Sequence, residues 1–282
     1  MTMAASPRIQ DSVGAALHSV RQNWQAVLIT AAIGALATTA VQMLGGLAPT
    51  LPYLTILVML AVSAMIYSVL IGLALRGGQP RLVLPEAARL FAAMAIIGFF
   101  FAIAGLVLAI VGSIVLVAGP YASMSPQMSA AGDQNAVNRL LEQMLGQNPW
   151  PIVTLCGVYF VIWFYLTTRL YLAAPASIDR GRILTFETWS WTKRDVLKIM
   201  GARAMLVAPA YVLTTALSYL LGRAVGIDMF NLSAAEPGPG AALIFAIVSA
   251  FLNVAIADAA GAALATALYR DLGGQTAQLP KG

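Results

Sequence analysis

The sequence predicts an all-α fold: a polytopic membrane bundle of six transmembrane helices with both termini in the cytoplasm. Of the 282 residues, 60% are hydrophobic and only 10% are charged, whereas a soluble domain carries about 25% charged residues. Six apolar segments are long enough to cross a bilayer, and the basic residues gather in alternate connections between them. Such a hydrophobic chain needs lipid as its solvent.

The six segments follow from the length that a bilayer requires, about 20 mainly apolar residues for each spanning helix. They lie at roughly residues 25–45, 53–75, 90–118, 151–173, 203–222 and 241–268. The third and the sixth are long enough to tilt or to extend beyond the hydrocarbon. We therefore expect a transmembrane domain at 25–268, a cytoplasmic amphipathic segment at 1–24 and a short cytoplasmic tail at 269–282. Residues 1–23 lack the apolar run and cleavage site of a signal peptide, so the first span is expected to remain in the protein.

The distribution of basic residues predicts the orientation. With the N-terminus in the cytoplasm, 14 of the 16 basic residues fall on the cytoplasmic side, and only Arg139 and Arg223 fall outside. This is the pattern of the positive-inside rule. It also accounts for the net charge of +5 without a nucleic-acid partner. The cytoplasmic residues are Arg8, Arg21, Arg76, Arg81, Arg89, Arg169, Arg180, Arg182, Lys193, Arg194, Lys198, Arg203, Arg270 and Lys281.

Two connections between the spans have a character of their own. Residues 119–150 form an outside loop in which 135–146 indicates a short amphipathic helix, and Trp150 marks the return to the membrane. Residues 174–202 form an inside loop where apolar and charged residues alternate, as expected in the head-group layer. Thr192 and Asp195 have the spacing of a capping box, so a helix is expected to begin there.

Small residues line one side of the third span. Gly98, Ala102, Gly105, Ala109 and Gly112 recur at spacings of four and three. In lipid, small side chains let two helix backbones approach closely. We therefore expect this seam to pack against a neighbouring helix.

Asp258 is the one acidic residue well inside an expected span, so it needs a partner or water. Arg169, near the cytoplasmic end of the fourth span, is the expected partner. Asn253 lies five residues before Asp258, about 140° around an α-helix, and is expected to serve a different contact. The pair could form a proton or ion relay, or a head-group site; a structural salt bridge that fixes helix register is the alternative.

Basic and aromatic residues are concentrated in the inside loop. Their positions would let them meet phosphate head groups, and ordinary positive-inside anchoring is the alternative. The candidates are Arg180, Arg182, Trp189, Trp191, Lys193 and Arg194.

The sequence does not predict an enzyme, a cofactor or a metal site. His18 is the only histidine and Cys156 the only cysteine, so no cluster with metal-ligand spacing exists. There is no GxSxG elbow and no GxxxxGK[ST] phosphate loop. Intramembrane aspartyl chemistry would require a second acid within the spans.

Three short motifs resemble a known family. Residues 169–175 (RLYLAAP), residues 186–193 (FETWSWTK) and the ending ALYRD at 267–271 resemble bacterial six-helix integral membrane proteins. That family is related to the membrane domain attached to some glycerophosphodiester phosphodiesterases. The resemblance implies a six-helix layout, a bacterial inner membrane and a link to lipid or envelope physiology. The soluble phosphodiesterase domain is absent, so the hydrolase activity is not implied.

Three functions remain open at this point. The first is a non-enzymatic inner-membrane protein that binds or organises phospholipids, or serves as a membrane partner of another protein. The second is a transporter or permease with a polar cavity near Arg169, Asn253 and Asp258. The third is a subunit of a larger membrane complex.

Overall fold

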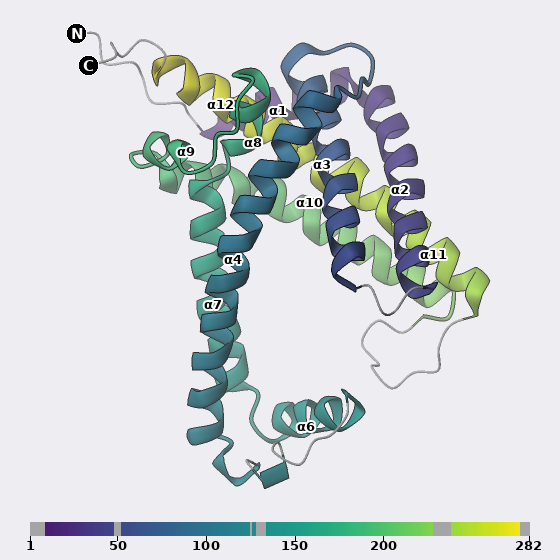
Figure 1. Cartoon of the computed structure of the whole chain (residues 1–282), viewed down its shortest axis with the longest axis vertical. Coiled ribbons are helices and arrows are strands. Elements are labelled where there is room, and N and C mark those ends of the chain that lie inside the picture. The colour runs from purple at the N-terminus through teal and green to yellow at the C-terminus, as the bar shows by residue number, and fades with distance from the viewer. Residues whose placement is uncertain (1–8, 48–51, 125, 128–133, 228–237, 277–282) are drawn as a thin grey trace. The chain divides into compact units, whose positions relative to one another are not determined.

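The computed structural model describes residues 9–47, 52–124, 126–127, 134–227 and 238–276. Within these ranges every regular element is a helix, which confirms the all-α prediction (Figure 1). The elements are α1 (Ile9–Gln22), α2 (Trp24–Leu47), α3 (Pro52–Arg76), α4 (Leu84–Ala118), η1 (Ala122–Met124), α6 (Gln134–Gln147), α7 (Trp150–Arg169), α8 (Ala173–Asp179), α9 (Glu187–Trp191), α10 (Val196–Ala224), α11 (Pro239–Leu252), the π-helix η2 (Asn253–Asp258) and α12 (Ala259–Thr276).

Among the residues that the structure describes, six helices are long and apolar enough to cross a membrane, as the sequence predicts. They run over Trp24–Gly45, Tyr53–Arg76, Leu84–Ala118, Trp150–Asp179, Val196–Ala224 and Pro239–Leu272. Parts of the expected terminal segments and of the outside loop (1–8, 125, 128–133 and 277–282) lie outside the described residues. So do Arg8 and Lys281, which enter the charge count.

The chain divides into two compact units. The first contains residues 1–96 and 168–282, and the second contains residues 97–167. Both α4 and α7 therefore contribute to each unit. The two units are described separately below.

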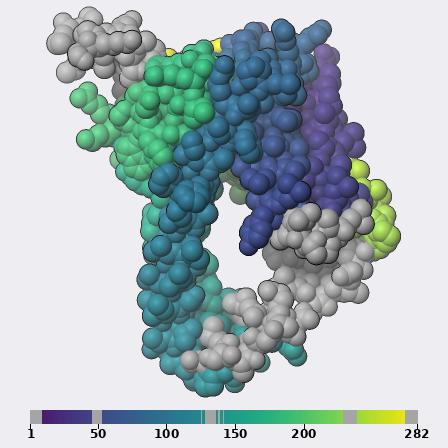
Figure 2. All heavy atoms as spheres, in the orientation of Figure 1, coloured from purple at the N-terminus to yellow at the C-terminus, as the bar shows by residue number. Residues whose placement is uncertain are grey.

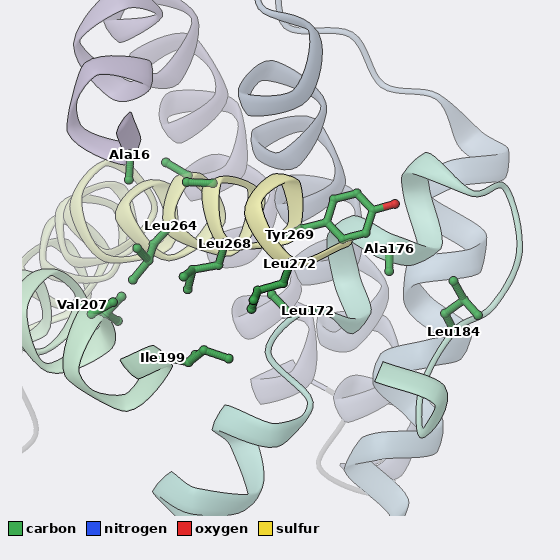
Figure 3. Packing of buried hydrophobic residues seen from close by; sticks show 13 residues of the cluster. Ala16, Leu172, Ala176, Leu184, Ile199, Val207, Leu264, Leu268, Tyr269 and Leu272 are labelled. Carbon is green, nitrogen blue, oxygen red and sulfur yellow. The ribbon is translucent and has the colours of Figure 1, made fainter. Parts of the chain in front are cut away.

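The core of the first unit lies between α1, α8, α10 and α12. Figure 3 shows Leu264 and Leu268 of α12 between that helix and Ile199 and Val207 of α10, with Ala16 of α1 also facing α12. All five side chains are buried. A second buried cluster joins α2 and α3 to the beginning of α4 and to η2. Alanine is frequent in both clusters, and small residues allow the close helix packing that membrane bundles use.

Polar contacts tie several helix ends together at one end of the first unit. Ser12 of α1 donates to Asp271 of α12 at 2.8 Å. Arg270 donates to the Leu75 carbonyl at the end of α3 at 2.6 Å, and Arg76 pairs with Glu86 at the start of α4. These ends are among those that the charge count places on one side of the membrane.

The second unit contains most of α4 and α7 together with α6. Both long helices expose many large apolar side chains, among them Phe99, Leu106, Ile110, Val158 and Phe160. In water such a surface would be an aggregation liability, whereas lipid tails cover it without cost. Tyr121, Met124 and Met144 form a small buried cluster, and the Tyr121 hydroxyl donates to the Asn148 carbonyl.

Candidate functional site

The connection from α7 to α10 is the polar feature that best defines a site. Helix α8 is almost wholly buried. After it the chain turns at Gly181, whose φ of +63° lies in the left-handed region that favours glycine. The Leu184 N–H donates to Ser177 Oγ at 2.9 Å and draws the following segment back onto α8. Part of this loop is therefore buried in the core of the first unit. The rest of the loop is exposed to the surroundings (green in Figure 2).

The start of α10 differs from the expectation. The helix begins at Val196, and its N-cap residue Asp195 makes no side-chain capping bond. Thr192 instead ends α9 and donates to the Arg169 carbonyl at 3.1 Å. The predicted capping box is therefore wrong, because a buried tertiary contact uses the Thr192 hydroxyl.

Three arginines around this connection each lie over an aromatic ring. The guanidinium carbon of Arg169 is 4.6 Å from the centre of the Trp189 ring. Arg180 lies 4.4 Å from the Trp191 ring, and Arg203 lies 4.7 Å from the Tyr171 ring. Each contact is worth roughly 0.5–1 kcal/mol when exposed and about 2 kcal/mol when desolvated. The stacking holds both tryptophans and the planar guanidinium groups in fixed orientations.

Two of these arginines also have hydrogen-bond acceptors within the protein. Arg203 donates to the Thr168 hydroxyl at 2.6 Å. Arg180 donates to the Tyr269 hydroxyl at 3.4 Å, and that hydroxyl donates to Asp179 at 2.7 Å. Arg180 is thus part of a polar network with Tyr269 and Asp179, whereas Arg203 Nε is buried without a hydrogen bond.

Arg169 is in a different situation. Only 4% of its surface is exposed, and its Nε is fully buried without a hydrogen bond. Among the described residues its side chain has no acceptor and no ion pair, only the Trp189 ring. A buried charge costs several kcal/mol unless it is paired and hydrogen-bonded. Within the part of the chain that the structure describes, no counter-charge offsets this cost for the guanidinium.

The α7–α10 connection, which carries Trp189, exposes basic and apolar side chains together. Lys193 and Arg194 are exposed, and Arg182 is exposed while it pairs with Glu187 at 3.2 Å. Ile183, Phe186 and Leu197 are also exposed, Leu197 by 77%. Side chains of these two kinds suit the boundary between head groups and hydrocarbon.

The expected pair between Arg169 and Asp258 is absent from the described ion pairs. Asp258 instead accepts a hydrogen bond from Asn253 Nδ2 at 3.2 Å. The separate role expected for Asn253 is therefore wrong. Residues 253–258 form a π-helix, whose i to i+5 bonding brings these two positions to the same face.

Further polar side chains lie near this π-helix. Asp258 is within electrostatic range of Tyr67 and Tyr211, and Arg203 is within range of both tyrosines and of Tyr171. The Tyr171 hydroxyl donates to the Gly261 carbonyl at 2.7 Å. Tyr67 and Tyr211 thus lie near both Asp258 and Arg203, an arrangement that the hydropathy pattern does not predict.

The small residues along one side of α4 do not all pack against another helix. A Cβ atom at Gly112 would lie 2.7 Å from Leu155 of α7, and one at Gly105 would lie 3.5 Å from the Tyr159 hydroxyl. Gly98, Ala102 and Ala109 are exposed. Only the C-terminal part of the seam includes positions where α7 approaches closely.

Comparisons with known proteins add nothing to this site. Among the described residues no group of three or more His, Cys, Asp or Glu side chains could hold a metal ion. The resemblance to the membrane domain of glycerophosphodiester phosphodiesterases remains a prediction. No family model, curated protein or solved structure matches the chain.

Proposed function

We propose that this chain is a non-enzymatic, multi-pass protein of a bacterial inner membrane that binds anionic phospholipid head groups. The connection between α7 and α10 forms the site, and Arg169 is the residue that receives the phosphate. The observation that carries the proposal is the buried Arg169 guanidinium, which has no hydrogen bond or counter-charge among the described residues.

The chemistry of Arg169 favours a phosphate as the missing partner. A guanidinium presents a planar fork of N–H donors that matches two phosphate oxygens, and charge-assisted bonds of this kind are about twice as strong as neutral ones. Trp189 holds the plane of the group from one side, which reduces the entropy lost on binding. Arg169 is also the last residue of α7, towards the end of the candidate span Trp150–Asp179 that the proposal orients to the cytoplasm.

The exposed side chains of the α7–α10 connection support the same ligand. Each basic residue near an anionic membrane surface adds about 1 kcal/mol of attraction. Lys193 and Arg194 would supply this attraction, while Ile183, Phe186 and Leu197 would enter the upper acyl region. The exposed side chains would bind the membrane surface, and Arg169 would bind the phosphate of one lipid there.

The proposed orientation puts this connection in the cytoplasm together with both termini. Its support is the distribution of basic residues in the sequence, and the contacts among the ends of α1, α3 and α12 agree with it. The resemblance to an inner-membrane family of the lipid or envelope system also supports this location.

The test is lipid retention by Arg169→Gln. Wild-type protein, purified gently from mixed phosphatidylglycerol and phosphatidylcholine of identical acyl chains, should retain phosphatidylglycerol in native mass spectrometry. The substitution removes charge-assisted bonds worth about 1.5–3 kcal/mol, so affinity should fall roughly 10- to 100-fold.

Arg182→Gln is the matched control. Arg182 is exposed and already paired with Glu187, so this variant should retain phosphatidylglycerol almost as the wild type does. Equal retention by Arg169→Gln and the wild type would contradict the proposal.

A transporter is the second candidate function. The Asn253–Asp258 contact within a π-helix favours it, because π-helical turns occur frequently at functional sites. Acidic residues within spans also mark ion and proton pathways. Uptake or proton release by reconstituted protein that disappears in Asp258→Asn would favour this function over lipid binding alone.

A further inference from the structure

A polar pocket lies where α1 passes into α2 and where α3 ends. Its volume is about 800 Å³, and amide side chains dominate its polar wall: Gln22, Asn23, Gln25 and Gln79. The turn at Gly77 and Gly78 forms another part, with φ values of +70° and +88°. These glycines bring backbone to the pocket without side chains to fill it.

The charge of this pocket is neutralised within the protein. Arg76 is the only charged residue that lines it. Both terminal nitrogens of Arg76 donate to the carboxylate of Glu86, each at 2.8 Å. A bidentate pair of this kind leaves no net charge. The pocket therefore offers many hydrogen-bond donors and acceptors but no excess of either sign.

An apolar groove of about 360 Å³ continues from this pocket between α2 and α3. Ile29 and Pro80 line both spaces. The one hydroxyl of the groove wall, on Thr30, is already bonded to the Ala26 carbonyl at 2.8 Å. The groove wall includes the small residues Gly34 and Ala37, which leave space for a ligand. The two spaces together are polar at one end and apolar at the other.

The floor of the groove is the close contact between the two helices. A Cβ atom at Gly34 would lie only 2.9 Å from Ile66 Cδ1, so α2 and α3 meet there and close the groove behind. Along α2 the groove runs from Ile29 to Ala37, about 12 Å at 1.5 Å per residue. One leaflet of hydrocarbon is about 15 Å thick, half of a 30 Å core. The groove thus extends over about four-fifths of the thickness of one leaflet and would hold most of an acyl chain lying in it.

From this arrangement we infer that the pocket and groove bind one glycerophospholipid whose head group is zwitterionic and carries a primary ammonium, as in phosphatidylethanolamine. The absence of net charge in the pocket disfavours an anionic head group. Amide N–H groups of Gln22, Gln25 and Gln79 can donate to the phosphate, and their carbonyl oxygens can accept from the ammonium. A quaternary ammonium has no N–H to donate. The exposed ring of Trp24 places this end at the membrane interface.

The site is separate from Arg169 and does not depend on the proposed function. Its residues come from α1, α2, α3 and the connection to α4, whereas Arg169 ends α7. The lipids also differ: Arg169 lacks a counter-anion, whereas this pocket already contains balanced charges.

The experiment offers the purified full chain an equimolar mixture of phosphatidylethanolamine, phosphatidylcholine and phosphatidylglycerol with identical acyl chains. Retained lipid is counted by native mass spectrometry. The wild type should retain phosphatidylethanolamine over phosphatidylcholine roughly tenfold, the value of one charge-assisted hydrogen bond. Gln25→Leu combined with Gln79→Leu should remove the preference.

The groove is tested by Ala37→Phe, which fills it and should lower retention of phosphatidylethanolamine. Ala40→Phe is the matched control, since Ala40 is exposed and lines neither space; retention should be unchanged. The preference for phosphatidylethanolamine is tested at Gln25 and Gln79, and retention of phosphatidylglycerol is tested at Arg169, so failure here and failure of the proposed function can be told apart. If Ala37→Phe is not monodisperse in gel filtration, Ile33→Trp at the outer wall of the groove replaces it.

Equal retention of phosphatidylethanolamine and phosphatidylcholine by the wild type would overturn the assignment of the head group. Unchanged retention in a monodisperse groove-filled variant would overturn the acyl-chain site. A preference for phosphatidylglycerol that survives Arg169→Gln would mean that an anionic lipid occupies this pocket, which also overturns the inference.

Discussion

Three arginines at or near the α7–α10 connection have different surroundings: Arg169, Arg180 and Arg203. All three lie over aromatic rings. Arg180 and Arg203 also donate to hydroxyl groups, although Arg203 Nε, like Arg169 Nε, is buried without a hydrogen bond. The Arg169 side chain contacts the Trp189 ring and has no hydrogen bond to an acceptor among the described residues. This difference is the reason why we propose Arg169, and not Arg180 or Arg203, as the residue that binds a head group.

Arg169→Met should therefore stabilise the lipid-free protein. Removing an unsatisfied buried charge recovers about 1–3 kcal/mol or more of desolvation, while the lost cation–π contact costs roughly 0.5–2 kcal/mol. We expect a net gain of roughly 1 kcal/mol in the free energy of unfolding, measured by thermal unfolding in delipidated detergent. Added phosphatidylglycerol should raise the melting temperature of the wild type but not that of the variant.

Arg203→Met is the matched comparison. It removes a hydrogen bond to the buried Thr168 hydroxyl, so stability should fall by about 1–3 kcal/mol. If Arg169→Met destabilised the delipidated protein as much as Arg203→Met does, Arg169 would be a structural residue and the lipid site would lose its basis.

At the scale of elements, the long spans could be predicted, and so could the short amphipathic helix expected at 135–146, which is α6 (Gln134–Gln147) in the structure. Helices α8 and α9 and the π-helix could not be predicted. Lipid forces each span to satisfy its backbone internally, so hydropathy alone located the six. Helices α8 and α9 have seven and five residues, too short to be stable alone, and their form depends on tertiary contacts. The π-helix at 253–258 has no hydropathy pattern of its own. The sequence therefore predicts that Asp258 needs a partner, but it does not predict that Asn253 is that partner.

The seam of α4 gives a prediction at this scale. Gly112→Ile should destabilise the protein by about 1–3 kcal/mol through overpacking, because even a Cβ atom there would lie 2.7 Å from Leu155. Gly98→Ile adds the same side chain at a position where a Cβ atom would have nothing within 4 Å. The free energy of unfolding should therefore not change. Thermal unfolding in detergent measures both effects, and equal losses would show that the two positions do not differ as described.

Gly98→Ile also tests whether the chain is a subunit of a larger complex. A lipid-facing Gly98 predicts the same mass in size-exclusion chromatography with light scattering before and after the substitution. Loss of a higher assembly in Gly98→Ile alone would indicate that a partner chain covers this face.

At the scale of the whole molecule, the cost of moving a charged side chain across a membrane limits both the fold and the charge distribution. Arginines and lysines cross a membrane at high cost, so they stay on the side where synthesis leaves them. The ends of α1, α3 and α12 that carry Arg270, Arg76 and their partners contact one another in the structure. The grouping of these helix ends could be predicted from the sequence, because it depends on the positions of the charged residues along the chain. The aromatic ring over each arginine could not be predicted, because it depends on long-range packing.

The measurement that tests the central claim most directly is the sidedness of the α7–α10 connection. In a Cys156→Ser background, a single cysteine replaces exposed Lys193 in one variant and exposed Gln143 of α6 in another. An impermeant maleimide is applied to bacterial spheroplasts before and after lysis. We expect labelling of Gln143→Cys in intact spheroplasts and of Lys193→Cys only after lysis. Labelling of Lys193→Cys in intact spheroplasts would contradict the account, since the proposed head-group site would then face the wrong leaflet.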